Sequence, residues 1–204
     1  MLQFIILGSQ TLKNIENQPP QHCAFKGECI ENVAKENCNV DVNSAKCWAY
    51  QKMTPATIDQ HFFVFMESES SEITDFRNFL QQFGESLHRF LYVQVIEAKF
   101  VNVILPLPKG NCPSLHFHQT QVVNEFAKLL KSQGFGIINV YQNLTSRAKM
   151  PKYLFGRRDR RLSKFRNYSQ NVKSTIHQLI GRRMGELKMP KDNPLFTEMH
   201  ILNL

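Results

Sequence analysis

The sequence predicts an α+β fold in which helices cover one face of a mainly antiparallel sheet, of the ferredoxin-like or RRM-like kind. Short apolar runs alternate with amphipathic segments between residues 58 and 145, in the order β-α-β-(β)-β-α-β. The chain has 204 residues, of which 42% are hydrophobic and 16 are Phe, so one domain can bury a Phe-rich core. We therefore expect a Cys-bearing N-terminal appendage at 1–57, an α+β core domain at 58–145 and a basic helical C-terminal region at 146–204.

The strands are predicted from short apolar runs that are bounded by turn residues. The segment 100–105 either extends the expected strand at 91–96 or pairs with it as a hairpin arm. Pro106, Pro108, Gly110 and Pro113 mark a loop before the next strand. The expected strands are 2–7, 61–66, 91–96, 100–105, 115–118 and 136–141.

The helices are predicted from apolar residues that recur at steps of three and four. Residues 73–90 carry a Phe-rich face, and residues 121–133 form a second amphipathic helix that ends at Gly134, a good C-cap. In the basic region, residues 152–165 and 168–183 are expected to be helical.

Two histidines flank one apolar residue in Leu115-His116-Phe117-His118. On a β-strand, residues i and i+2 share a face, so His116 and His118 would point the same way while Phe117 anchors the strand. That arrangement can hold a divalent metal ion at the surface of a sheet.

Positive charge is concentrated near the C-terminus. The net charge of the chain is +8, yet residues 147–188 hold thirteen Lys and Arg and two acidic residues, which leaves −3 for the remainder. Such segregation favours a polyanion, and nucleic acid before a membrane surface, although a solvated helix face is the simpler alternative. The expected nucleic-acid-binding residues are Lys149, Lys152, Arg157, Arg158, Arg160, Arg161, Lys164, Arg166, Lys173, Arg182 and Arg183.

Five cysteines, an odd number, predict reduced thiols and a cytoplasmic or other reducing compartment. Four of them, Cys23, Cys29, Cys38 and Cys47, could instead hold zinc, but no Cys-x-x-Cys pair supports this alternative. The sequence has no apolar run long enough to span a bilayer, so no membrane partner is expected.

The layout resembles the HUH endonucleases, the group of rolling-circle replication initiators and single-tyrosine transposases. The resemblance rests on His116-Phe117-His118, on the order of elements over about 58–188, and on a tyrosine in a basic helix. It implies that His116, His118 and Glu97 bind Mg²⁺ or Mn²⁺, and that Tyr153 or Tyr168 attacks a phosphate in single-stranded DNA. The expected activity is then nicking and joining of DNA.

A different class of function fits the same features. A Phe-rich α+β sandwich with a basic C-terminal block also suits a non-catalytic RNA-binding subunit of a larger nucleoprotein complex, such as a ribosomal protein or a CRISPR-type RNA-processing protein. Basic helices that lie along RNA need no particular histidine or tyrosine. The test that separates the two classes is whether His116 and His118 face the same way and lie within reach of a tyrosine hydroxyl.

Overall fold

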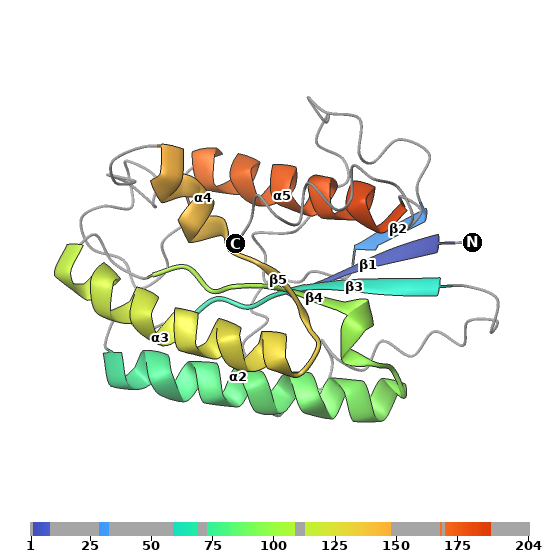
Figure 1. The fold of residues 1–204 in the computed structure, drawn as a ribbon, viewed down its shortest axis with the longest axis horizontal. Helices are drawn as coiled ribbons and strands as arrows, with labels where there is room; N and C mark the ends of the chain where they lie inside the picture. The colour runs from blue at the N-terminus through green and yellow to red at the C-terminus, as the bar shows by residue number, and fades with distance from the viewer. Residues whose placement is uncertain are drawn as a thin grey trace.

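The centre of the protein is a parallel β-sheet (Figure 1). A computed structural model describes residues 2–8, 29–32, 59–68, 73–108, 113–147, 168 and 170–188. Within these residues the sheet has the strand order β2-β1-β3-β4-β5, and every neighbouring pair is parallel. The predicted antiparallel sheet is therefore wrong. The strands are β1 (Leu2–Gly8), β2 (Cys29–Asn32), β3 (Asp59–Phe65), β4 (Val101–Ile104) and β5 (Gly136–Ile138).

The central strand, β3, is buried on both faces. Every residue from Phe62 to Met66 is buried, and successive side chains point into different apolar clusters, with Phe63 and Phe65 on one face and Phe62 and Val64 on the other. Continuous apolar strands of this kind are typical of parallel sheets, because helices cover both faces.

Helices pack on both faces of the sheet, so the predicted one-sided arrangement is also wrong (Figure 1). Two long helices cover one face and two cover the other, which makes a doubly wound α/β sandwich. In the described part of the chain, none of the helices is long and apolar enough to cross a membrane. One face carries α2 (Ile73–Gln94) and α3 (Pro113–Ser132); the other carries α4 (Val140–Arg147) and α5 (Gln170–Lys188).

Several predicted elements are confirmed, and two predicted strands are wrong. The strands at 2–7 and 61–66 and the helices at 73–90 and 168–183 are present, with ends that differ by a few residues. The predicted strand 91–96 is wrong because α2 continues to Gln94, and a short 3₁₀ turn, η3 (Ala98–Phe100), leads into β4. The predicted strand 115–118 is wrong because these residues form the first turns of α3.

The helices α2 and α3 end in the same way with different residues. In α3, the left-handed position after the helix is Gly134, with φ +92°, and the amide of Phe135 donates to the carbonyl of Leu130. In α2 the equivalent position is Val95, with φ +52°, and the amide of Ile96 donates to the carbonyl of Leu91. Glycine adopts this conformation without strain, whereas a β-branched residue does not.

Candidate functional site

The carboxyl edge of the sheet is the candidate functional site. In doubly wound sheets, ligands bind outside the carboxyl ends of the strands, at the point where the strand order reverses. Here the order reverses at β1, which has β2 on one side and β3 on the other. This edge lies at the left in Figure 1, where α2, α3 and α5 begin. Their N-terminal ends carry partial positive charge and favour a negative group at this edge.

Gly8 ends β1 in a conformation that only glycine tolerates well. Its φ is +137°, and a Cβ at this position would overlap the backbone carbonyl of Phe65 on β3. The backbones of β1 and β3 therefore come into close contact where the strands end. Ser9 follows Gly8 in the sequence and lies outside the described residues.

The carboxyl end of β3 brings an acidic side chain next to this close contact. Phe65 is followed by Met66, Glu67 and Ser68, of which Glu67 is half-buried and the other two are buried. Tyr168 comes from just before α5 and packs on Phe65, with ring centroids 6.4 Å apart. Burial raises the pKa of Tyr168 well above its usual value, and the nearby Glu67 carboxylate raises it further. Gly8, Phe65, Glu67 and Tyr168 thus gather at the switch point.

A second polar group lies at the far side of the same edge. His116, in the first turn of α3, is buried and packs edge-on against Tyr141, at the start of α4, with ring centroids 6.2 Å apart and planes at 88°. Tyr141 follows β5, which is three strands away from β1. At a strand spacing of ~4.8 Å, β5 lies about 14 Å from β1, so the pair of His116 and Tyr141 is next to a different strand from Gly8.

The structure separates the residues predicted to bind a metal. His116 and His118 lie on a helix, where two residues apart means a rotation of about 200°, so they face different ways: His116 is buried and His118 is exposed. Glu97 lies before β4, at the amino edge of the sheet, where it pairs with Lys99 at 2.8 Å. The Mg²⁺ or Mn²⁺ prediction requires His116 and His118 to share one face of a β-strand. In the structure both residues are in α3. Among the described residues, no group of three or more His, Cys, Asp and Glu side chains could hold a metal ion.

The two candidate nucleophilic tyrosines have different outcomes. Tyr153 lies outside the described residues. Tyr168 is buried, and its raised pKa disfavours the phenolate that attack on a phosphate needs.

Most of the basic residues predicted to bind nucleic acid lie outside the described part of the chain. Of those in the structure, Lys173, Arg182 and Arg183 are on α5. The predicted zinc ligands Cys23, Cys38 and Cys47 are also outside it, and of Cys29 the structure describes only the strand to which it belongs. The basic residues outside the described part are Lys149, Lys152, Arg157, Arg158, Arg160, Arg161, Lys164 and Arg166.

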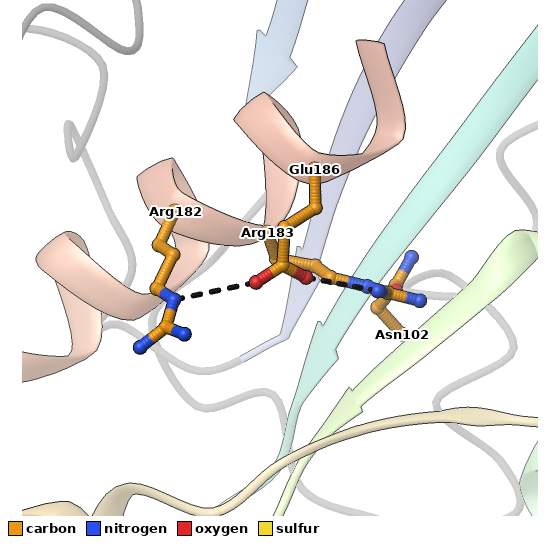
Figure 2. A network of polar contacts seen from close by, with 4 residues as sticks. All are labelled: Asn102, Arg182, Arg183 and Glu186. Carbon is orange, nitrogen blue, oxygen red and sulfur yellow. Dashed lines mark hydrogen bonds and ion pairs between the residues drawn. The ribbon is translucent and has the colours of Figure 1, made fainter. Parts of the chain in front are cut away.

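Arg183 reaches from α5 to the sheet and bonds to residues of the protein itself (Figure 2). Its Nε donates to Oδ1 of the buried Asn102 on β4 at 2.9 Å, and its Nη1 lies 3.0 Å from Glu186. Asn102 also donates to the carbonyl of Phe62, at 3.3 Å. Gly136, its partner on β5, leaves room for this side chain, because a Cβ there would overlap Asn102 Oδ1. This network lies at the amino edge and fixes α5 to the sheet.

The comparisons with known proteins identify a fold and no family. The sequence matches no protein-family model, and no curated protein matches it. Among solved structures, it is similar to a member of the lipolytic protein G-D-S-L family from Veillonella parvula DSM 2008. The match covers 93% of this chain and 100% of the other, with a TM-score of 0.59 and 10% sequence identity. The two proteins share a fold.

This likeness overturns the functional reading of the sequence. The resemblance to HUH endonucleases is wrong, since the sheet is parallel and the similar structure is a lipolytic-family protein. The nucleic-acid-binding and DNA-nicking function that this resemblance implies is therefore also wrong. The RNA-binding alternative was based on the same α+β sandwich and on the basic C-terminal block, and the parallel sheet removes the first of these two supports.

The tetrapeptide in the name of that family does not occur in this chain. The most similar four residues, Gly84-Glu85-Ser86-Leu87, lie inside α2, where Ser86 and Leu87 are buried. A serine nucleophile must be exposed to its substrate, so Ser86 is not a candidate.

Proposed function

We propose that this protein hydrolyses a carboxylic ester at the carboxyl edge of its sheet, in the group around Gly8 and Glu67. The observation that carries the proposal is the likeness in fold, over 93% of the chain, to a protein named as lipolytic. The position of the site is supported by the parallel strand order, which places the switch point at β1 and β3.

The proposed nucleophile is Ser9, because it directly follows Gly8 at the carboxyl end of β1. Its Oγ would attack the carbonyl carbon of the ester while the hydroxyl proton passes to a base. The alcohol would then leave with a proton, and water would release the carboxylic acid from the acyl-serine. The helix N-termini at this edge would favour the negative charge that develops on the carbonyl oxygen.

Glu67 is the proposed proton acceptor. It is partly exposed and extends β3, the strand that pairs with β1 along the whole length of β1. Tyr168, whose hydroxyl stays protonated because burial and Glu67 raise its pKa, would help to hold Glu67 in place as a neutral neighbour.

A fluorophosphonate probe tests this proposal, because it reacts with activated serines. The purified protein is labelled, digested and mapped by mass spectrometry, and hydrolysis of p-nitrophenyl acetate, butyrate, octanoate and decanoate is measured in parallel. We expect the label on Ser9, and Ser9→Ala should lower kcat by roughly 10³-fold or more. Ser86→Ala is the matched control, and it should keep both labelling and activity. Label on a different serine would refute the assignment of Ser9.

Ligand binding without hydrolysis at the same edge is a second candidate. It is favoured by the position of the buried histidines in the described chain: His116 packs on Tyr141, which follows β5, three strands away from β1, and His177 lies inside α5. Serine hydrolases commonly use histidine as the base. No labelling and no hydrolysis of any of the four esters would overturn the hydrolase proposal in favour of this one.

We also propose a reducing compartment, cytoplasmic or other, on the basis of the odd number of cysteines. Thiol titration of protein purified without reductant should find free thiols. One equivalent of zinc in the same sample, lost on Cys→Ser changes at Cys23, Cys29, Cys38 and Cys47, would instead support the zinc alternative.

A further inference from the structure

We propose that this protein attaches to an anionic lipid bilayer through the ends of α2 and α3 at the amino edge of the sheet. The inference concerns a surface of attachment and not a substrate, and it does not depend on the proposed function, whose site lies at the opposite edge. The expectation of no membrane partner rests on the lack of a spanning segment, and attachment to a bilayer surface needs none. The end surface consists of Arg89, Tyr92 and Val95 on or just after α2 and of Lys128, Leu129 and Lys131 on α3.

The ends of the two helices lie side by side at the amino edge (Figure 1). The ring of His88, in α2, packs edge-on against Phe135, which follows α3, with centroids 6.1 Å apart. Gly134 lies against Ala98, because a Cβ at Gly134 would be 3.8 Å from the Ala98 Cβ. The exposed side chains at these two helix ends therefore belong to one surface.

Apolar side chains on the end surface are exposed to an unusual degree. Tyr92 is 86% exposed, Val95 89% and Leu129 54%, and they are three of the four large hydrophobic side chains that are exposed among the described residues. Val95 is also strained, because it holds φ +52° at the position where α3 has Gly134. A strained and exposed valine gains nothing from packing in the described part of the chain, whereas a partner that takes it out of water would stabilise it. The exposure and the strain together indicate that a partner covers this surface.

The charge of the end surface complements an anionic partner. Residues 88–99 and 128–134 hold four Lys and Arg and one acidic residue, Glu97. Glu97 pairs with Lys99 at 2.8 Å, so the other three cations, all exposed members of the end surface, set its sign. Anionic headgroups attract Lys and Arg side chains that lie close to a bilayer, and the net charge of +8 draws the whole chain toward such a surface.

A bilayer fits these features better than a nucleic acid or a second protein. A nucleic acid is held mainly through its phosphates, and these give an exposed valine and leucine no apolar surface to contact. A stable protein interface buries about 800 Å² on each partner around closely packed anchors, and three apolar side chains on two helix ends are a small area by comparison. A bilayer accepts separate apolar tips, with tyrosine at the level of the headgroups and cations around it.

This attachment turns the candidate site toward water. The helix α2 has 22 residues and is about 33 Å long, and it begins at the carboxyl edge and ends in the proposed contact. The group around Gly8 and Glu67 then lies at the edge of the sheet that faces away from the bilayer. A substrate would reach this group from solution, which is the opposite of what an enzyme that acts on bilayer lipids requires.

Co-sedimentation with vesicles tests the inference. Wild-type protein should sediment with vesicles of phosphatidylcholine and phosphatidylserine, and much less with phosphatidylcholine alone. The double variant Tyr92→Ser/Val95→Gly should weaken binding to the mixed vesicles about tenfold or more, since two apolar side chains no longer leave water. Phe117→Ser is the matched control, because Phe117 is 62% exposed near the start of α3, at the opposite edge, and this variant should bind like wild type. Thermal unfolding of each variant shows whether it is folded.

A second pair of variants tests the charge. Lys128→Gln/Lys131→Gln should weaken binding to the mixed vesicles, whereas Arg77→Gln, an exposed change near the start of α2, should not.

The inference is overturned if wild-type protein does not bind the mixed vesicles. It is also overturned if Tyr92→Ser/Val95→Gly and Phe117→Ser bind these vesicles equally well, because charge elsewhere in the chain would then account for the binding. Loss of a single-stranded DNA oligonucleotide by Tyr92→Ser/Val95→Gly, with vesicle binding kept, would overturn it in favour of a nucleic acid. The fluorophosphonate labelling of Ser9 is independent of all these results, so the two proposals fail separately.

Discussion

Arg183 and Arg182 are adjacent on α5, carry the same charge and share Glu186 as an ionic partner, yet only Arg183 bonds to a buried group (Figure 2). Replacement of Arg183 by Met keeps most of the apolar stem and removes the donor to Asn102 Oδ1. A hydrogen bond from a charged donor contributes about 1.5–3 kcal/mol, and an acceptor left buried without a partner has a similar cost. We expect Arg183→Met to lower the free energy of unfolding by about 2 kcal/mol, and the melting temperature by about 4–8 °C in a chain of this size.

Arg182→Met is the matched control. Arg182 makes one solvent-exposed ion pair with Glu186, at 3.3 Å, and such pairs contribute about 0–1 kcal/mol. Urea unfolding, followed by circular dichroism, gives both free energies. The double variant Asn102→Val/Arg183→Met replaces both partners by apolar groups and should recover part of the loss. The reasoning about the buried amide is refuted if Arg182→Met and Arg183→Met lower the free energy of unfolding by the same amount. It is also refuted if the double variant loses more stability than the single variants Asn102→Val and Arg183→Met lose together.

Three further changes test the backbone and the pH dependence of stability. Val95→Gly should raise the free energy of unfolding by about 1 kcal/mol, because it relieves a β-branched residue at φ +52°; a lower melting temperature would contradict this. Gly8→Ala should lower the free energy of unfolding by at least about 2–3 kcal/mol, because the Cβ would overlap the Phe65 carbonyl at a φ that suits only glycine. The control is Gly185→Ala, in open space inside α5, which should raise the urea midpoint. Burial lowers the pKa of His177, so its neutral form is favoured in the folded state. Its contribution to stability is present above about pH 6.5 and is lost as the pH falls below it, and His177→Gln should reduce the loss of stability between pH 7.5 and 5.5.

The sequence predicts the elements whose pattern is long or strongly apolar. The helix at 73–90 was identified because its Phe and Leu residues recur on one face, and the same residues pack against the sheet in the structure. The strand at 61–66 was identified from an unbroken apolar run. That run also indicated a strand that is buried on both faces, which is typical of a parallel sheet.

The start of α3 is the largest difference between the predicted and the observed helices. The prolines around it predict a loop at Pro113, but proline is also common in the first turn of a helix, and α3 begins at that residue. With the helix started eight residues too late, His116 and His118 were assigned to a strand and to one face. The predicted metal site and the resemblance to a nuclease both depend on that strand, which is helical in the structure. A local pattern of three residues cannot decide its own secondary structure, because the flanking residues set the helical register.

The candidate site could be predicted from the sequence only in part, because it depends on the strand order. Gly8, Glu67 and Tyr168 are far apart in the chain, and each is unremarkable in its local sequence. They meet because β1 and β3 are neighbours in a parallel sheet, so their carboxyl ends lie at the same edge. The residues that follow each apolar run were a usable signal, since any parallel arrangement places them at that edge. Net charge predicts the site less well, because it indicates which partners a surface attracts and does not indicate the fold. Arg183, which contributes to the basic segment, bonds to Asn102 and holds α5 on the sheet.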